Sequence, residues 1–313
     1  MELRQLRYTV AVADSSSISG AASKLFIAQS ALSLQISHLE DELGVKLFHR
    51  SRSGVTATER GHVFLRHARS ILQQVRDTEH AMHAQPDAPS GEVALAIPQS
   101  VSAALALPLM RACIDQLPRV RLRLTEELSG HVADQVRTGK ISMGVMFDED
   151  NLDSFDWVPL ACERLCAVGS PALISSGPDA MPLGSLMSLP LILPTEGHGV
   201  RAQVDALARD IGFQSMNVIA EITSISVLES MLIAGMGVTV QARMPMAAAI
   251  ARGELVAREL TSPPVVRRVA LCRSRSSGPT EAARAVWHLV ATTVRSLCER
   301  GVWMGAEVEG AEQ

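Results

Sequence analysis

The stretch from Ala28 to Glu40, AQSALSLQISHLE, constrains the fold of this chain more than any other segment. Its apolar residues have the spacing that places them in one buried stripe on a helix: Leu32, Ile36, Leu39 and, beyond the stretch, Leu43. The opposite face holds short or neutral side chains where a solvated helix carries Lys and Glu: Ser30, Ser33, Leu34 and Ser37. This pattern predicts a helix that lies against another molecule.

Two shorter helical patterns precede this stretch, at about Leu3–Ala13 and Ile18–Leu25. The second contains Ala21 and Ala22, whose small side chains let two helices approach closely. A brief turn, FIAQ, then leads into the next helix, and Gly44 is placed to end that helix in the left-handed conformation. This order is typical of a helix–turn–helix, in which one helix braces while the next one projects.

The segment VKLFHRSRSGVTAT predicts a short two-stranded hairpin, a wing, which turns at Ser53-Gly54. Basic residues and no acid lie near its tip: Lys46, Arg50 and Arg52. From Val45 to Arg76 the chain has seven basic residues and one acidic residue, although its net charge is −4. This local excess of positive charge indicates a polyanionic partner for the N-terminal part only.

A long helix is predicted from Glu59 to about Gln85, with Thr58 as its N-cap. Apolar or small residues recur along it at alternating steps of four and three: Phe64, Ala68, Ile71, Val75, Thr78 and Met82. This spacing predicts a coiled-coil seam between two chains. A single helix packed on its own domain is the alternative. The segment AQPDAPSGE, which follows, is predicted to be a linker.

From Val93 onward, strand-like segments alternate with helical ones. The strand-like segments are EVALAI, VRLRLTEE, ISMGVMF, RLCAVGS, PLILPT, NVIAEI, GVTVQA and VVRRVALCR. Such alternation predicts doubly wound parallel sheets with helices on both faces, here in two small lobes. A helix from about Thr280 to Arg300 closes the set, and the tail over 303–313 is expected to be disordered.

Composition narrows the class of protein. The chain has 313 residues, of which 47% are hydrophobic and 20% charged, with no apolar run near the ~18 residues that cross a bilayer. Because its first residues are charged where a signal peptide is apolar, we expect a cytoplasmic protein without a membrane partner. The five cysteines form no CxxC pair, and no metal or other cofactor is predicted.

Motifs for nucleotide binding, for an activated serine and for a zinc protease are missing from the sequence, so the chain is not predicted to be an enzyme. A cytoplasmic small-molecule-binding protein or an enzyme on a two-lobed α/β scaffold is the competing class. A helix–turn–helix with a basic wing favours a DNA-binding protein over both.

The order of helix–turn–helix, basic wing, long helix and two-lobed α/β unit resembles the LysR-type transcriptional regulators. The segments AASKLFIAQSALSLQISHLEDELGVKLFHR and GVTATERG are similar to the N-terminal signature of that family in residues and spacing. One departure is Ser30, where the family commonly has proline; serine also begins a helix well, and we expect no loss of function. In the second half, LILPTEGHGVRAQVD and EITSISVLESMLIAGMGVTV resemble the branch that contains the nitrogen assimilation control regulator.

The resemblance implies a winged helix–turn–helix domain over residues 1–58 and a linker and dimerisation helix with a hinge over 59–88. An effector-binding domain similar to the periplasmic binding proteins would follow over 89–302, with lobe I at about 92–162 and 266–300 and lobe II at about 163–265. It also implies a homotetramer, built as a dimer of dimers, on dyad-symmetric promoter sites in double-stranded DNA. RNA polymerase would be a further partner. Regulation would come from a small-molecule effector between the lobes or from the protein's own abundance.

The residues expected to contact DNA are Gln29, Ser30, Ser33, Leu34, Ser37, Arg50 and Arg52. Short side chains let a helix approach base edges in the major groove, and Leu34 is expected to contact a thymine methyl group. A tolerated exposed leucine is the alternative for Leu34. Arg50 and Arg52 would lie along the phosphate backbone of the DNA or in a narrow minor groove. The alternative for Arg50 is an internal ion pair, and the alternative for Arg52 is a solvated charge in a loop.

Ligands of doubly wound sheets bind beyond the carboxyl ends of the strands, which places effector contacts in the loops there. The candidates are Ser100, Ser102, Asp148, Thr195, Thr223 and Ser224. Ser102 and Ser224 could instead be simple N-caps, and Asp148 could belong to a solvated acidic loop. His198 is interpreted as a loop histidine and not as a catalytic one.

Overall fold

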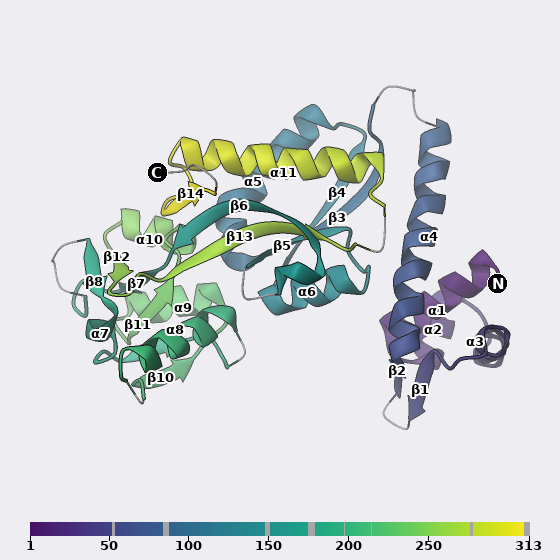
Figure 1. Cartoon of the computed structure of the whole chain (residues 1–313), viewed down its shortest axis with the longest axis horizontal. Coiled ribbons are helices and arrows are strands. Elements are labelled where there is room, and N and C mark those ends of the chain that lie inside the picture. The colour runs from purple at the N-terminus through teal and green to yellow at the C-terminus, as the bar shows by residue number, and fades with distance from the viewer. Residues whose placement is uncertain are drawn as a thin grey trace.

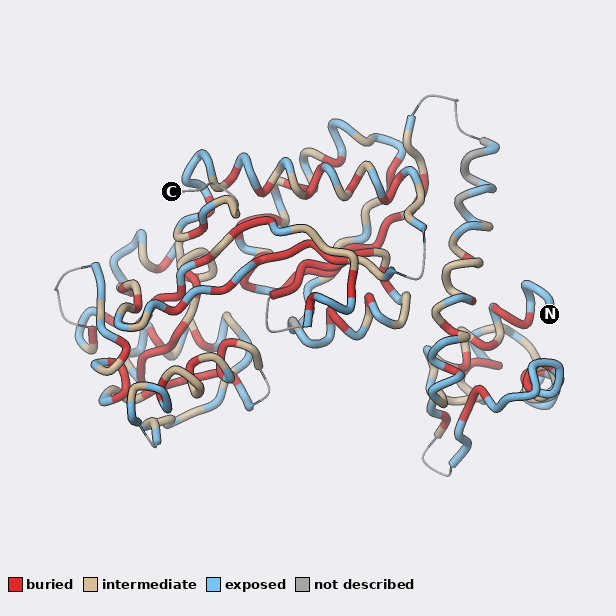
Figure 2. Tube along the Cα trace, in the orientation of Figure 1, coloured by how far each residue is buried: buried red, intermediate tan, exposed pale blue. Residues whose placement is uncertain are grey.

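The computed structural model describes residues 1–51, 54–83, 88–147, 151–174, 179–196, 198–213, 215–275 and 278–309. Figure 1 shows a small N-terminal unit, which ends in the long helix α4, and a larger α/β unit of two lobes. The described strands form one two-stranded sheet and two six-stranded sheets. Buried residues follow the middle of each large sheet, as Figure 2 shows.

The N-terminal unit contains α1 (Leu3–Ser15), α2 (Ile18–Leu25), α3 (Gln29–Leu43), β1 (Phe48–Ser51), β2 (Gly54–Ala57) and α4 (Glu59–His83). Its core contains Leu32, Ile36 and Leu39, which confirms most of the predicted stripe on α3. Leu43 is 39% exposed, however, and Glu40 is buried in its place. Helix α3 ends at Gly44, whose φ of 67° lies in the left-handed region as predicted.

Helix α4 begins at its predicted cap, because the Thr58 hydroxyl accepts a hydrogen bond from the Gly61 amide at 2.9 Å. Along the predicted seam, Ala68 is buried against α1 together with Leu6 and Leu72. The assignment of Ala68 to a seam between chains is therefore wrong, because α1 of the same chain covers it. Phe64 and Ile71 also pack partly against this cluster.

Farther along α4, the side chains of the predicted seam are less buried. Val75 is half-buried, and Thr78 and Met82 are exposed. Pairing between chains along this C-terminal half of α4 stays a prediction.

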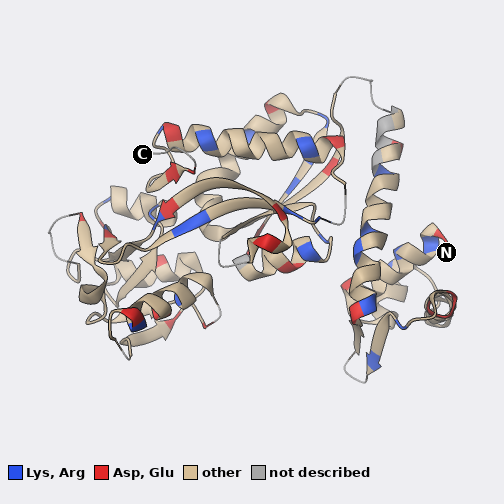
Figure 3. Ribbon diagram, in the orientation of Figure 1, with Lys and Arg blue, Asp and Glu red and all other residues tan. Residues whose placement is uncertain are grey.

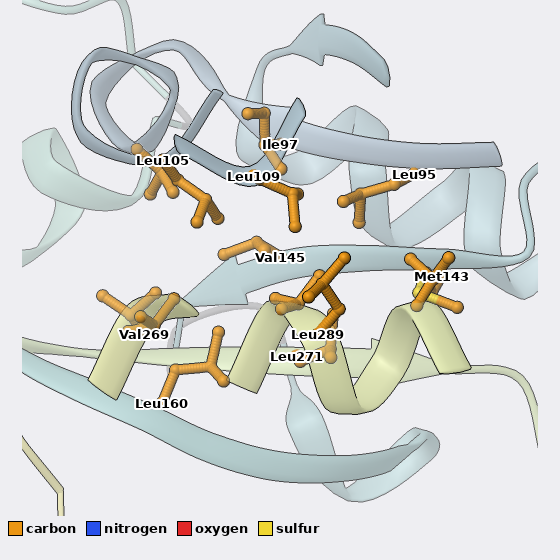
Figure 4. Packing of buried hydrophobic residues seen from close by; sticks show 14 of the residues in the cluster. Leu95, Ile97, Leu105, Leu109, Met143, Val145, Leu160, Val269, Leu271 and Leu289 are labelled. Carbon is orange, nitrogen blue, oxygen red and sulfur yellow. The ribbon is translucent and has the colours of Figure 1, made fainter. Parts of the chain in front are cut away.

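The first lobe is a mixed sheet in the order β14-β6-β13-β5-β3-β4. Its strands are β3 (Gly91–Pro98), β4 (Val120–Glu127), β5 (Met143–Phe147), β6 (Asp156–Arg164), β13 (Val266–Arg273) and β14 (Ala306–Val308). Its helices are α5 (Gln99–Gln116), α6 (Ser129–Arg137), η2 (Leu152–Ser154) and α11 (Glu281–Glu299). Helices α5 and α11 cover one face, where Figure 4 shows their leucines against β3, β5 and β13, and α6 packs on the other.

The second lobe is a mixed sheet in the order β10-β9-β11-β7-β12-β8. Its strands are β7 (Cys166–Gly169), β8 (Ala180–Pro182), β9 (Leu191–Leu193), β10 (Val218–Glu221), β11 (Val238–Gln241) and β12 (Val256–Thr261). Its helices are α7 (Leu183–Leu186), α8 (Gly199–Asp210), α9 (Ile225–Ile233), η3 (Met244–Met246) and α10 (Ala247–Ala251).

All eight predicted strand segments contain strands of the structure, but the expectation of wholly parallel sheets is wrong. Strand β13 runs antiparallel to β5 and β6, and β7 runs antiparallel to β11 and β12. The reason is the path of the chain, which leaves the first sheet after Arg164 and returns to it at Val266. These two crossover segments lie side by side, and the Leu165 amide donates to the Val265 carbonyl at 2.8 Å.

The expectation of a disordered tail from residue 303 is also wrong for the described residues, which extend to 309. Trp303 is 1% exposed, and β14 pairs with β6 in antiparallel register. The indole fixes this segment, since its Nε1 donates to the buried Glu163 carboxylate at 2.9 Å. Among the described helices, none has the length and apolar character that crossing a membrane requires.

Candidate functional site

Helix α3 lies on the side of α4 that faces away from the two lobes (Figure 1), and its exposed face carries small, neutral side chains. Gln29 and Ser30 are exposed at the start of the helix, and Ser33 and Ser37 are half-buried along it. The Leu34 side chain is 54% exposed. The structure therefore brings the predicted α3 residues together on one accessible surface.

The wing lies close to this surface. The Arg50 guanidinium donates to the Ser33 hydroxyl at 3.1 Å, so β1 and α3 present their polar groups together. Arg50 forms no ion pair among the described residues, which argues against the alternative of an internal pair. Arg52 and its neighbour at the tip lie outside the described residues.

Phe26 is a surface residue that the sequence analysis did not assign. Its side chain is 95% exposed, and its backbone has a φ of 56° in the turn that joins α2 to α3. An aromatic residue in a tight turn just before an exposed helix was the available signal. Phe26 precedes Gln29, the first residue of α3, by three positions, so an exposed apolar ring stands in the turn that leads into this helix.

The buried carboxylate of Glu40 fixes the wing to α3. It accepts hydrogen bonds from the amides of Leu47 at 2.8 Å and Phe48 at 3.3 Å, and from the Lys46 ammonium at 3.0 Å. Burial by itself would raise the pKa of Glu40, but these bonds and the Lys46 charge bring that pKa below its ordinary value of 4.5. Lys46, one of the basic residues noted near the wing, therefore holds the wing in place.

A pH dependence follows from Glu40. Because the folded pKa is lowered, this carboxylate stabilises the unit above pH 4.5 and the stabilisation is lost as the pH falls through the folded value. We expect Glu40→Gln to cost about 1–3 kcal/mol at pH 7, with a smaller difference at low pH. Hydrogen exchange of the wing amides at pH 7 and at a series of pH values below 4.5 measures this. Glu42→Gln removes a carboxylate of the same helix that pairs with the N-terminal ammonium on the surface, and as the control it should leave exchange of the wing amides unchanged at pH 7.

A cavity of about 40 Å³ lies between the lobes, lined by residues that follow β3, β5 and β10 and by residues of α8 and β11. Of the expected effector contacts, Ser100 and Thr223 line it. Ser102, Thr195 and Ser224 are not among its lining residues. The Ser102 hydroxyl instead donates to Glu126, and Ser224 is the N-cap of α9. Asp148 lies outside the described residues.

The cavity borders a buried ion pair that the sequence analysis missed. Arg267 donates from Nε and Nη2 to the Glu163 carboxylate at 2.8 and 2.6 Å, and from Nη2 to the Ser100 hydroxyl at 2.9 Å. The guanidinium also lies over the Phe147 ring, 3.9 Å from its centre. The available signal was the pair Arg267-Arg268 in a predicted strand, since alternation turns one of two neighbours inward.

Two polar atoms of the residues that line the cavity are buried and have no hydrogen-bond partner in the described part of the chain: His198 Nδ1 and Thr239 Oγ1. Desolvation and the nearby Arg267 charge lower the pKa of His198, so its imidazole is neutral at neutral pH. Buried polar groups normally find partners. His198 Nδ1 and Thr239 Oγ1 are therefore free to form a hydrogen bond with a group that enters the cavity.

The two parts of the chain match two known protein families. Residues 3–62 match the bacterial regulatory helix-turn-helix proteins of the lysR family, and residues 86–295 match the LysR substrate binding domain.

Named relatives span most of the chain. The nitrogen assimilation regulatory protein nac of Klebsiella aerogenes is 33% identical over 77% of this chain and 78% of its own length. The HTH-type transcriptional regulator BbuR of Bordetella bronchiseptica is 29% identical over 94% of this chain and 90% of its own length.

Full-length OxyR of Pseudomonas aeruginosa has the same fold, with a TM-score of 0.71 and 23% identity over 94% of this chain and 98% of that one. The sequence matches therefore agree with the order of units in the structure. The chain belongs to the LysR family of bacterial transcriptional regulators, with a DNA-binding helix–turn–helix and an effector-binding domain.

Proposed function

We propose that two copies of this chain place their α3 helices in successive major grooves of a dyad-symmetric promoter site. The observation that carries this proposal is the neutral surface of α3 with Arg50 beside it. A helix with short side chains can approach base edges, while a cation at the flank can reach the phosphate backbone. In this arrangement Gln29, Ser30 and Leu34 meet bases, and Arg50, released from Ser33, meets phosphate.

Pairing of two chains through α4 would produce the arrangement of two α3 helices that this proposal requires. The C-terminal half of α4 leaves Thr78 and Met82 exposed, which suits pairing with the same helix of a second chain. A two-fold axis through that pairing would present two α3 helices to two half-sites. We extend this to a dimer of dimers that contacts RNA polymerase at the promoter.

The cleft between the lobes is proposed to bind a small effector through His198 and Thr239. Its volume of about 40 Å³ has room for only a few water molecules in this conformation. A larger ligand would require the lobes to move apart, and preferential binding to one arrangement would shift the balance between arrangements. The small volume also favours the second mode of control, in which the abundance of the protein sets promoter occupancy.

Selection of bound sequences from a random duplex library tests the DNA-binding proposal. The purified protein should enrich an interrupted dyad, and Leu34→Arg should change the preferred base at one step of each half-site. The reason is that the substitution replaces an apolar contact to a thymine methyl group with a hydrogen-bond donor suited to guanine. Such a contact discriminates against the wrong base by about 1–3 kcal/mol in binding free energy. Leu43→Arg adds the same charge to the same helix away from this face and should keep the base preference.

The same protein can be screened with small metabolites by thermal shift, where a specific stabilisation would support the effector cleft. If the purified protein enriched no duplex sequence, the DNA-binding proposal would be contradicted. If Leu34→Arg kept the base preference of the unchanged protein, the proposed contact of Leu34 with a base would be contradicted.

A further inference from the structure

A second and larger cavity lies between the N-terminal unit and the first lobe, well away from the inter-lobe cleft. Its volume is about 510 Å³, which is in the range of small-molecule sites. One wall comes from α1 and α4, and the other from β3, β4, β13, the segment 139–143 and the start of α11. We call it the linker groove.

Cationic side chains dominate the linker groove. Six line it, against the two carboxylates of Asp14 and Glu92: Arg66, Arg69, Arg76, Arg123, Lys140 and Arg273. They come from separate elements of both walls, and Figure 3 shows blue positions on α4 and on the facing lobe. Like charges that converge from two walls repel one another unless a counter-ion lies between them.

Carboxylates of the chain neutralise only two of these six charges in the part of the chain that the structure describes, those of Arg69 and Arg273. Arg69 binds Asp14 and donates to the Thr138 carbonyl at 2.8 Å, which joins α4 to the first lobe. Among the described residues, Arg66, Arg123 and Lys140 form no ion pair. Arg273 Nε forms an ion pair with Asp156 Oδ2, 3.5 Å away, but it finds no hydrogen-bond acceptor among the described residues.

We propose that the linker groove binds a small polyanion that carries two or more phosphate groups. A single carboxylate could meet only part of a set of cations that stands on both walls, whereas a chain of phosphates can meet cations on α4, on β4 and in the 139–143 segment together. Arginine and lysine are the side chains that bind phosphate best.

The position of the groove argues against DNA as its ligand. Helix α3 lies on the opposite side of α4 (Figure 1), so a duplex seated on α3 is separated from the groove by α4 itself. The groove is also concave and bounded by two walls, which suits a small molecule. Because a bound polyanion would bridge α4 and the first lobe, it would favour this arrangement of the two units.

Isothermal titration of the full-length protein with inorganic triphosphate and pyrophosphate tests the proposal, with orthophosphate and sulfate as weaker anions. We expect one site per chain and a Kd for triphosphate at least about tenfold lower than for orthophosphate. A nucleoside triphosphate in a further titration shows whether the natural ligand carries a base, since equal affinity means that the phosphates alone are recognised. No binding of triphosphate at millimolar concentration would overturn the proposal.

The double variant Arg123→Gln/Lys140→Gln should weaken triphosphate binding at least about tenfold. The control Arg111→Gln/Arg295→Gln removes the same charge from exposed sites of the same lobe outside the groove and should change the affinity less than about twofold. Equal weakening in both variants would show a diffuse charge effect and would overturn the site.

DNA affinity separates this proposal from the proposed function. The Arg123→Gln/Lys140→Gln protein should bind DNA like the unchanged protein, and a loss of DNA affinity would show that these residues contact DNA, contrary to the proposal. A protein that binds triphosphate at one site but selects no duplex sequence would leave the groove standing and contradict the proposed function alone.

Discussion

Glu163→Ala is expected to destabilise the first lobe by about 3–5 kcal/mol, the range seen when one partner of a buried ion pair is removed. Glu163 is 0% exposed and Arg267 1% exposed, so the guanidinium would stay buried without its counter-charge. Trp303 Nε1 would lose its acceptor as well. The remaining Ser100 hydroxyl and Phe147 ring cannot replace a carboxylate.

Urea unfolding followed by tryptophan fluorescence measures this effect, because the chain's three tryptophans, Trp157, Trp287 and Trp303, all lie in the first lobe. Glu307→Ala is the matched control: its ion pair with Arg164 is 3.3 Å long and exposed on both sides, so its loss should cost less than about 1 kcal/mol. A Glu163→Ala effect as small as that of the control would contradict the prediction.

A double variant separates loss of the pair from loss of packing. Replacing both Glu163 and Arg267 with methionine removes the buried charges together, and such replacements are often neutral or stabilising. We expect this protein to recover most of the stability lost in Glu163→Ala. Failure to recover would mean that the shape of these side chains or their hydrogen bonds with Trp303 and Ser100, and not the paired charges, hold the strands together.

This pair also bears on the cleft, because its partners stand opposite each other in the register of β6 and β13. Those are the strands that continue into the two crossover segments between the lobes. The pair therefore holds together the two strands that lead into the second lobe, so any movement of that lobe would begin beyond them.

The thiol of Cys298 lies close to this pair. Burial first, and then the charges of Glu163 and Glu299, raise the pKa of Cys298 to about 11, so that thiol stays protonated.

The parts of the fold that depend on local patterns could be predicted from the sequence. The stripe of Leu32, Ile36 and Leu39, the Thr58 cap and the left-handed Gly44 each depend on neighbours within one or two helical turns. Strand β14 could not be predicted, since the three residues AEV are too short for an alternation to be recognised, and the strand is ordered by its pairing with β6 and by Trp303.

The same distinction holds for the sites. The α3 surface was predicted because a helix places its own residues on one face. The cleft was predicted only as a set of loops, because what each side chain contacts there is decided by distant residues. Ser100 lines the cavity as expected, yet its hydroxyl is held by Arg267, 167 positions away in the chain. No local pattern contains that information.

Gly61→Ala is expected to disrupt the N-terminal unit. A Cβ on this buried glycine would stand 2.0 Å from the Leu47 carbonyl oxygen and 3.3 Å from the Ala57 Cβ. The carbonyl cannot move away without cost, because it accepts the Thr58 amide at 2.9 Å and the Leu47 amide is bound to Glu40. Inserting a methyl group against fixed backbone should cost about 3 kcal/mol or more.

The expected result is a loss of DNA affinity of at least about 100-fold, because the wing and the start of α4 would separate from α3. Gly20→Ala is the matched control, since a Cβ there meets nothing closer than 3.5 Å and should be neutral or stabilising by about 0.5–1 kcal/mol. The tryptophan transition of the first lobe should stay unchanged in both proteins, which shows that the damage is local. If Gly61→Ala bound DNA as tightly as Gly20→Ala, the close contact between α4 and the wing would not be needed to position α3, and the DNA-binding surface would have to be formed by α3 without the wing.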